Sequence, residues 1–268
     1  MEILFLGTGT SQGVPVIGCP CSVCSSSDPH DKRLRTSALV IDSGDNNILI
    51  DIGPDFRMQM LTNNIRHIEG ILITHAHRDH IGGLDDIRPF NWAQKQNMDL
   101  YGNSIALEAI KNDFHYVFEP HQYPGLPEAT LHDVSDCKPF RIGATTVTPV
   151  NGMHKDLPIL GYRLDDDQGK KLAYLTDMNF INADELQKLQ GLDVLVINAL
   201  RKKKHYSHFS LAEALEVVAS CNPKQCFLTH ISHEMGRYSD VEQELPPNVH
   251  LSFDNLRYRI ANHKSLLP

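Results

Sequence analysis

The segment Thr74–His80 (THAHRDH) contains four side chains that can bind metal ions. They belong to His75, His77, Asp79 and His80. A lone histidine is usually a core or surface residue, but imidazole and carboxylate groups at this density are costly to bury unless they are paired or bound to a metal. The segment follows the apolar run Gly70–Ile73, so a turn after a strand can direct alternate side chains toward two adjacent ions. We therefore interpret it as part of a metal site.

Three further candidate ligands lie just past expected strands. His154 follows the run Thr146–Val150 after three intervening residues, whereas Asp177 and His230 each come directly after an apolar run that ends in threonine. Taken alone, each of the three has an equally good structural interpretation. Because they share their place past a strand with the THAHRDH segment, we count them as candidate ligands.

The complete pattern, His-x-His-x-Asp-His followed by a later His, Asp and His, resembles the motif of the metallo-β-lactamase superfamily. The resemblance extends over nearly the whole chain, from Leu4–Gly9 to Thr229–His233. It implies an α/β fold, the αββα sandwich in which two mixed sheets are flanked by helices. It also implies two ligand sets joined by one carboxylate: His75, His77 and His154 for one ion, Asp79, His80 and His230 for the second, and Asp177 as the bridge.

Two divalent ions in such a site lie about 3.5–4 Å apart and can share a hydroxide. Hydrolysis by this metal-bridged hydroxide is the mechanism that the resemblance implies. Imidazole-rich ligand sets that include carboxylates accept Zn²⁺, Mn²⁺ or iron. We therefore expect two divalent ions, Zn²⁺ or Mn²⁺, and the sequence leaves the choice between them open.

A C-x-C-x-x-C cluster lies in the segment Gly18–Cys24. In a reducing compartment such cysteines are better interpreted as metal ligands than as disulfides, and three thiolates with one histidine form a standard tetrahedral zinc site. We expect His233 as the fourth ligand because it lies three residues from His230, while His30 is closer in sequence and stays open. The expected structural Zn²⁺ ligands are Cys19, Cys21, Cys24 and His233. Three buried, reduced cysteines are the alternative.

Within the superfamily, this cluster resembles that of the phosphoribosyl cyclic phosphodiesterases of the carbon–phosphorus lyase pathway, and it also occurs in a branch linked to pyrroloquinoline quinone biosynthesis. Phosphodiesterase branches place a histidine before a helix, where it donates a proton to the leaving group. In the segment Arg201–Ser210 (RKKKHYSHFS), His208 matches that place and His205 is the competitor. We count His208 and Asp79 as the catalytic residues. The basic residues are interpreted either as a solvated loop or as an anion-attracting segment at a helix N-terminus.

The glycine-rich segment Gly7–Gly13 (GTGTSQG) is not a dinucleotide-binding fingerprint. Its spacing, G-x-G-x-x-x-G, is one residue too long, and no helical pattern follows. We expect instead a loop whose backbone approaches a metal ion or a phosphate.

Short apolar runs with β-branched residues predict the strands that must position these side chains. The runs are Ile3–Leu6, Ala38–Ile41, Ile48–Ile52, Gly70–Ile73, Thr146–Val150, Leu172–Leu175, Val194–Ile197, Gln225–Leu228 and Asn248–Phe253. Helical patterns lie at Pro54–Asn63, Ser104–Asn112, Ala183–Leu189 and Ser210–Ser220. In the last helix we expect Ser210 as N-cap with Glu213 three residues on. Strands that are apolar on both faces suit two sheets between outer helices.

No repeat or linker divides the chain, so we expect a single domain over residues 1–268. The irregular part is Asp113–Cys137, which has three prolines and no lysine or arginine. It is either a surface excursion or a lid over the site.

The composition limits the classes of partner. With 25 Lys+Arg against 33 Asp+Glu, the formal net charge of the 268 residues is −8, which argues against a protein whose whole surface binds nucleic acid. No apolar run approaches the roughly 20 residues that span a bilayer, and no signal peptide is visible. We therefore expect a cytoplasmic protein without membrane contact, and we leave a homodimer open.

The resemblance favours a metal-dependent phosphodiesterase that hydrolyses a small cyclic phosphate or a nucleotide-like phosphodiester. One alternative is a nuclease of the tRNA 3′-processing type, although the chain has no Gly- and Lys-rich insertion that would serve as an RNA-binding arm. The other is a non-catalytic, ligand-binding member like the quinone-biosynthesis branch.

Overall fold

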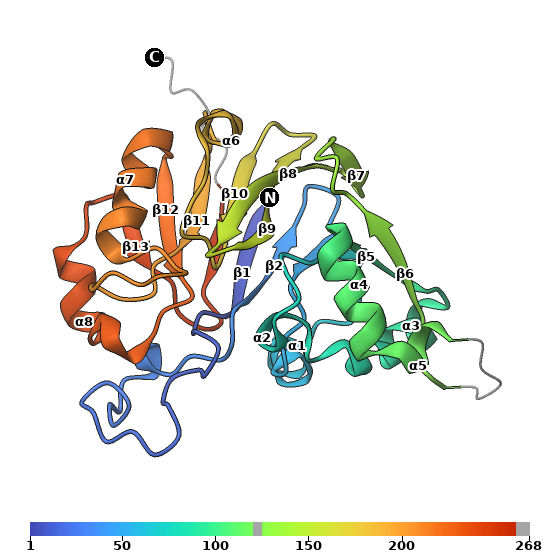
Figure 1. The fold of residues 1–268 in the computed structure, drawn as a ribbon, viewed down its shortest axis with the longest axis horizontal. Coiled ribbons are helices and arrows are strands. Elements are labelled where there is room, and N and C mark those ends of the chain that lie inside the picture. The colour runs from blue at the N-terminus through green and yellow to red at the C-terminus, as the bar shows by residue number, and fades with distance from the viewer. Residues whose placement is uncertain (120–124, 261–268) are drawn as a thin grey trace, which may run out of the picture.

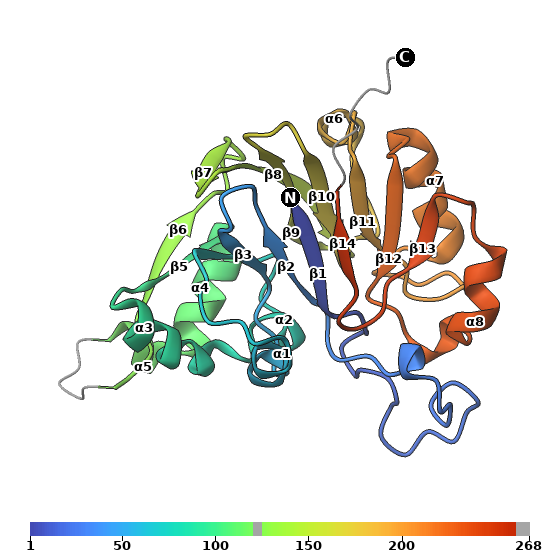
Figure 2. The same ribbon diagram turned by 180° about the vertical axis from the view of Figure 1, so that it is seen from behind.

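The structure, a computed structural model, describes residues 1–119 and 125–260. Two seven-stranded sheets pack face to face, and helices cover their outer surfaces (Figure 1, Figure 2). The αββα sandwich implied by the resemblance is confirmed. Among the described residues, no helix combines the length and the apolar character that crossing a bilayer requires.

The first sheet contains, in spatial order, β14 Arg257–Arg259, β1 Glu2–Gly7, β2 Ser37–Ile41, β3 Asn47–Ile50, β4 Gly70–Leu72, β5 Met98–Gly102 and β6 Ala129–Asp133. Neighbouring strands are antiparallel from β14 to β3 and parallel from β3 to β6. The carboxyl ends of β3 and β4 therefore meet at the same edge of the sheet.

The second sheet contains, in spatial order, β13 Val249–Leu251, β12 Gln225–Thr229, β11 Val194–Asn198, β10 Lys171–Leu175, β9 Leu157–Asp166, β8 Thr145–His154 and β7 Phe140–Ile142. The strands from β10 to β13 run parallel, and those from β10 to β7 alternate in direction. Parallel pairing places the carboxyl ends of β10 and β12 at one edge.

The helices pack on the outer faces as two groups. The first group, on the outer face of the first sheet, contains α1 Phe56–Asn63, α2 Arg78–Ile81, α3 Arg88–Gln94, α4 Ser104–Asp113 and α5 His115–Phe118. The second group, on the outer face of the second sheet, contains α6 Ala183–Lys188, α7 Leu211–Cys221 and α8 Tyr238–Val241. Short 3₁₀ turns lie at Pro29–Asp31, Leu84–Ile87, His233–Met235 and Glu242–Glu244.

Alternate residues of the central strands belong to different parts of the core. On β1, Ile3 and Phe5 join the cluster between the sheets, together with Tyr162 and Tyr174 of the second sheet. The intervening residues of β1 face the helices of the first group. Because both faces of the central strands are buried, their sequences are apolar throughout, which is why they could be predicted.

The structure corrects three details of the expected elements. The β8 strand continues to His154, so this histidine ends a strand instead of following one after three residues. The segment Asp113–Cys137 is only partly irregular, because it contains α5 and the edge strand β6; residues 120–124 lie outside the described residues. Strands β5, β6, β7, β9 and β14 were not predicted. The edge strands β6 and β14 are largely exposed and polar, so they lack an apolar run.

Candidate metal centre and active site

The candidate ligands gather where strands of the two sheets end. The segment 74–80 follows β4, His154 ends β8, Asp177 follows β10 and His230 follows β12. Asp177 and His230 have φ values of 59° and 55°, in the left-handed region that residues other than glycine rarely occupy. Backbone strain of this kind concentrates at functional sites, where the surrounding structure holds it in place.

The Asp177 carboxylate lies between two groups of histidines. Its Oδ1 is 3.0 Å from His230 Nδ1 and 3.4 Å from His80 Nε2. Its Oδ2 is 3.8 Å from His75 Nε2. A carboxylate whose two oxygens face different imidazole groups has the arrangement needed to bridge two ions.

The two expected ligand sets are each brought together. Asp79, His80, Asp177 and His230 offer ligand atoms that all lie within 4.8 Å of one another. In the other set, the ring centroids of His75, His77 and His154 are 4.6 to 5.5 Å apart. The structure thus places all seven predicted ligands around one centre.

Three buried ring nitrogens support the fit of metal ions to these residues. His75 Nε2, His80 Nε2 and His230 Nδ1 are inaccessible to solvent and make no hydrogen bond among the described residues. Buried polar atoms are nearly always satisfied, so an orphaned group needs a partner. All three atoms face the Asp177 carboxylate, which is where divalent ions would provide that partner.

In the candidate ligands His80 and His154, the protein holds the ring nitrogen Nδ1. His80 Nδ1 is 2.7 Å from Asp51 Oδ2, and Asp51 also accepts hydrogen bonds from the backbone and hydroxyl of Thr74. His154 Nδ1 donates to the carbonyl oxygen of Asp177 at 2.7 Å. Such contacts fix the ring orientation and leave Nε2 free for a metal. Sequence reasoning missed Asp51, although it directly follows β3 as the ligands follow their strands.

The electrostatics of the centre follow from burial among opposite charges. Burial opposes ionisation of Asp79, but the adjacent His80 outweighs it and holds the pKa of the Asp79 carboxyl below its usual range. Burial likewise disfavours the charged form of His80, yet Asp177, Asp79 and Asp51 raise its pKa well above the ordinary value. Burial lowers the pKa of His75. The centre therefore combines ionised carboxylates with imidazoles, which suits cations.

His208 lies at the centre and His205 lies beside it. His208 Nε2 is 3.2 Å from Asp177 Oδ2, and its ring stacks on His230 with centroids 5.0 Å apart. His205 contacts His208 through the two Nδ1 atoms, 3.1 Å apart. The geometry therefore favours His208 over His205 as the residue that meets a bound substrate.

The basic residues before α7 are largely neutralised by glutamates. Arg201 pairs with Glu234, Lys202 Nζ lies 2.5 Å from Glu244 Oε2, and Lys204 Nζ lies 3.3 Å from Glu213 Oε1. The predicted capping box of α7 is confirmed, with Ser210 and Glu213 bonded to each other's backbone. Because a carboxylate already caps this helix, its N-terminus is not a free anion site, and the solvated-loop interpretation of the basic run fits better.

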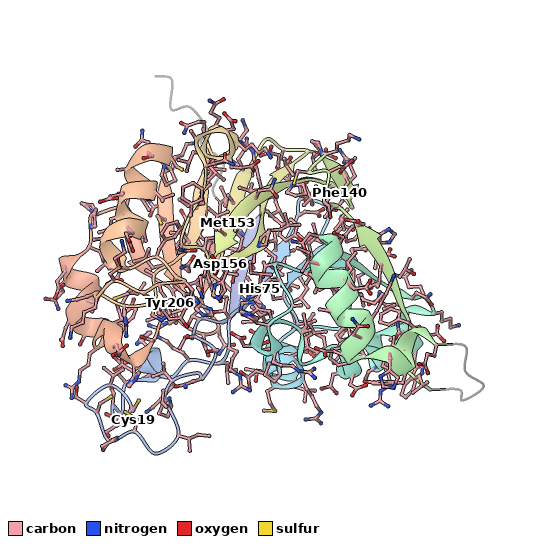
Figure 3. All side chains as sticks on the ribbon, viewed as in Figure 1. Cys19, His75, Phe140, Met153, Asp156 and Tyr206 are labelled. Atoms are coloured by element: carbon pink, nitrogen blue, oxygen red, sulfur yellow. The ribbon has the colours of Figure 1, made fainter. Side chains whose placement is uncertain are left out.

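A second candidate metal site lies in the N-terminal loop, where Figure 3 shows Cys19 away from the sheets. Cys19, Cys21, Cys24 and His233 offer ligand atoms within 4.8 Å of one another. The sulfurs of Cys19 and Cys21 are 3.4 and 3.3 Å from His233 Nδ1. Zn–S and Zn–N bonds of about 2.3 and 2.0 Å in a tetrahedron require similar separations.

The thiols also differ in charge. A hydrogen bond from the Cys24 backbone, together with His233, lowers the pKa of Cys21 to about 6, whereas burial raises the pKa of Cys24 to about 11. A thiolate at Cys21 suits a metal ligand. His30, the alternative fourth ligand, bonds Asp28 and stacks on Tyr238 instead.

Replacing Cys21 with serine should remove about one zinc ion per chain and lower the Tm by about 5 °C or more, because structural zinc contributes directly to folding. Elemental analysis and thermal unfolding measure the two effects. Cys137→Ser, at a cysteine outside the cluster, is the matched control. Unchanged zinc content in Cys21→Ser would mean that the three cysteines are only packed thiols.

A cavity of about 430 Å³ opens onto the centre. Its lining includes Asp79, Asp177, His208 and His230 as well as the segment Thr10–Gln12. The glycine-rich loop therefore forms one wall of this cavity, while the approach of its backbone to a metal ion or a phosphate stays a prediction. His233 also lines the cavity, so the cysteine cluster lies beside the candidate active site.

The comparisons with known proteins agree with this geometry. Residues 46–231 match the family described as Beta-lactamase superfamily domain. The chain belongs to this superfamily. A solved structure described as a new diphosphatase from the PhnP family superposes with a TM-score of 0.87 and 36% identity, covering 96% of this chain and 97% of that one. Among superfamily members, this likeness confirms the branch resemblance stated from the cysteine cluster.

Two further proteins are similar to this superfamily member. A protein named octanoyltransferase from Porphyromonas gingivalis is 40% identical over 96% of this chain, but the chain spans only about half (51%) of that protein's length. The Zn²⁺-bound PqqB structure from Methylobacterium extorquens superposes with a TM-score of 0.77 at 19% identity, covering 97% of this chain and 100% of that one. At that identity the likeness shows the shared fold alone.

Proposed function

We propose that the chain is a metal-dependent hydrolase of small phosphodiesters or diphosphates, with two divalent ions, Zn²⁺ or Mn²⁺, at the Asp177 centre and one structural Zn²⁺ at the cysteine cluster. The Asp177 carboxylate between two imidazole groups carries this proposal, because a carboxylate whose oxygens face two sets of candidate ligands is placed to serve two ions. The likeness to a PhnP-family diphosphatase over nearly the whole chain supports the substrate class.

Different residues of the chain would bind the ions and donate the proton. His75, His77 and His154 would hold one ion, Asp79, His80 and His230 the other, and Asp177 both. When bound, the ions would polarise the phosphate oxygens and activate water. His208 Nε2 faces the centre from the cavity wall, where it can donate a proton to the departing oxygen. The His208 ring is oriented at Nε2 by Asp177 Oδ2 and at Nδ1 by the Ser207 hydroxyl, which is 3.0 Å away.

The surroundings favour a small substrate over RNA. The cavity of about 430 Å³ suits one small ester. The basic residues near it are paired with glutamates, so they provide little charge for a polyanion. The name octanoyltransferase describes a relative twice as long as the match, and it assigns no activity to this chain.

A turnover assay tests the proposal against the ligand-binding alternative. The chain loaded with Mn²⁺ or Zn²⁺ should hydrolyse bis(p-nitrophenyl) phosphate and a dinucleoside diphosphate. The same chain after removal of metal by a chelator should hydrolyse neither. A metal-loaded chain that turns over neither compound would refute the proposed function and favour a binding role.

A further inference from the structure

A second cavity adjoins the first and has a different lining. It has a volume of about 330 Å³, and its walls include Lys155, Asp156, Leu157 and Tyr206. His77 and His154 line both cavities, so the second one opens beside the metal centre. A substrate whose phosphate lies at the centre would therefore extend into it.

Tyr206 is an exposed aromatic residue in the lining of both cavities. Its side chain is 71% exposed, although it follows His205 directly and lines both cavities. The Lys155 ammonium lies 5.9 Å from the centroid of its ring. The His205 ring packs against one face of Tyr206, with the ring centroids 4.4 Å apart. Because Tyr206 is still largely exposed, the other face of its ring is available for stacking on the planar group of a substrate.

The two walls of the second cavity are joined by Asn179, which lies two residues beyond Asp177. Its side chain accepts a hydrogen bond from the Lys155 backbone at 2.7 Å and donates to the Tyr206 carbonyl at 3.3 Å. The Asn179 backbone also bonds Met153 at the end of β8. Figure 3 shows Asp156 and Tyr206 near the end of β8, on the same side as His75. The spacing of the two walls is thus set by the loop that bears Asp177.

The polar groups of this cavity limit the classes of ligand that it can bind. Asp156 is 88% exposed, and its carboxylate, 3.5 Å from Lys155 Nζ, can only accept hydrogen bonds when ionised. An ionised carboxylate accepts hydrogen bonds from sugar hydroxyls, as acidic residues do from ribose in nucleotide sites. Together with an aromatic face, this combination matches a nucleoside.

We propose that the second cavity is a nucleoside subsite, in which Tyr206 stacks on the base and Asp156 binds the ribose hydroxyls of a substrate whose phosphate lies at the Asp177 centre. The assignment rests on the proposed function and makes it more specific. The substrate is then a nucleotide ester or a nucleoside diphosphate derivative.

Equilibrium binding tests the subsite without turnover. The metal-loaded chain should bind adenosine 5′-monophosphate more tightly than ribose 5-phosphate, which lacks the base, as measured by calorimetry. Tyr206→Ala should reduce this affinity ratio by about tenfold or more, since stacking on an aromatic side chain is worth that much per base. Tyr206→Phe keeps the ring and should keep the ratio. Phe180→Ala, at an exposed aromatic residue that lines neither cavity, is the matched control.

Each part of the assignment has an outcome that overturns it. Equal affinity for the two ligands, or an unchanged ratio in Tyr206→Ala, would remove the base-stacking role. Equal affinity for adenosine 5′-monophosphate and its 2′,3′-dideoxy analogue would remove the role of Asp156. A chain that binds the nucleotide through Tyr206 but hydrolyses no ester would keep the subsite and refute the proposed function.

Discussion

Asp177→Asn should lose both ions of the centre and reduce hydrolysis of bis(p-nitrophenyl) phosphate on the order of 10³-fold or more, because the ions contribute several kcal/mol of transition-state stabilisation. The substitution keeps the size of the side chain and removes the charge that faces both imidazole groups. Elemental analysis of the variant should find about one zinc per chain, retained by the cysteines. Steady-state kinetics measures the loss of activity.

The matched control for this substitution is Asp184→Asn, at an exposed carboxylate in the first turn of α6. It should keep the metal content and the activity of the native chain. If Asp177→Asn also retained full activity and both ions, then Asp177 would not bridge and the binuclear assignment would be wrong.

His208→Ala should slow hydrolysis of an alkyl or cyclic phosphodiester on the order of 10²-fold or more, the size of effect typical of a positioned proton donor. An alkoxide needs a proton as it departs, whereas nitrophenolate hardly does. The loss on bis(p-nitrophenyl) phosphate should therefore be much smaller. Metal content should stay the same, because His208 is outside both ligand sets.

A comparison of His208→Ala with His205→Ala decides which of the two histidines donates the proton. His205 contacts His208 and not the Asp177 carboxylate, so its replacement should affect the alkyl ester much less. Equal losses on both esters in His208→Ala would mean that His208 binds phosphate or maintains structure. A loss confined to His205→Ala would move the proton donor three residues upstream.

The residues of the metal centre could be predicted because they are dense and follow apolar runs. Four ligands in Thr74–His80 are hard to explain otherwise, and the buried central strands have continuous apolar sequences. His233 could be placed near the cysteines because it follows His230 closely in the chain. The seven ligands and the cysteine cluster do converge in the structure, while their binding of metal remains a prediction.

Other features depend on contacts between distant segments and leave no local signal. Asp51 supports His80 across 29 residues, and Asn179 joins the end of β8 to Tyr206. The pairing of Arg201 and Lys202 with distant glutamates could not be predicted from the sequence either, which left an anion site open as one interpretation of the basic run. Edge strands such as β6 were missed because exposure on one face removes the apolar pattern.

Metal stoichiometry measured together with activity tests the binuclear hydrolase most directly. Chain purified without added metal should contain about three ions, and a chelator that removes two of them should abolish hydrolysis while one zinc stays with the cysteines. Restoring two equivalents of Mn²⁺ or Zn²⁺ should restore activity. Undiminished hydrolysis when only the cysteine-bound ion remains would contradict a catalytic centre built on Asp177.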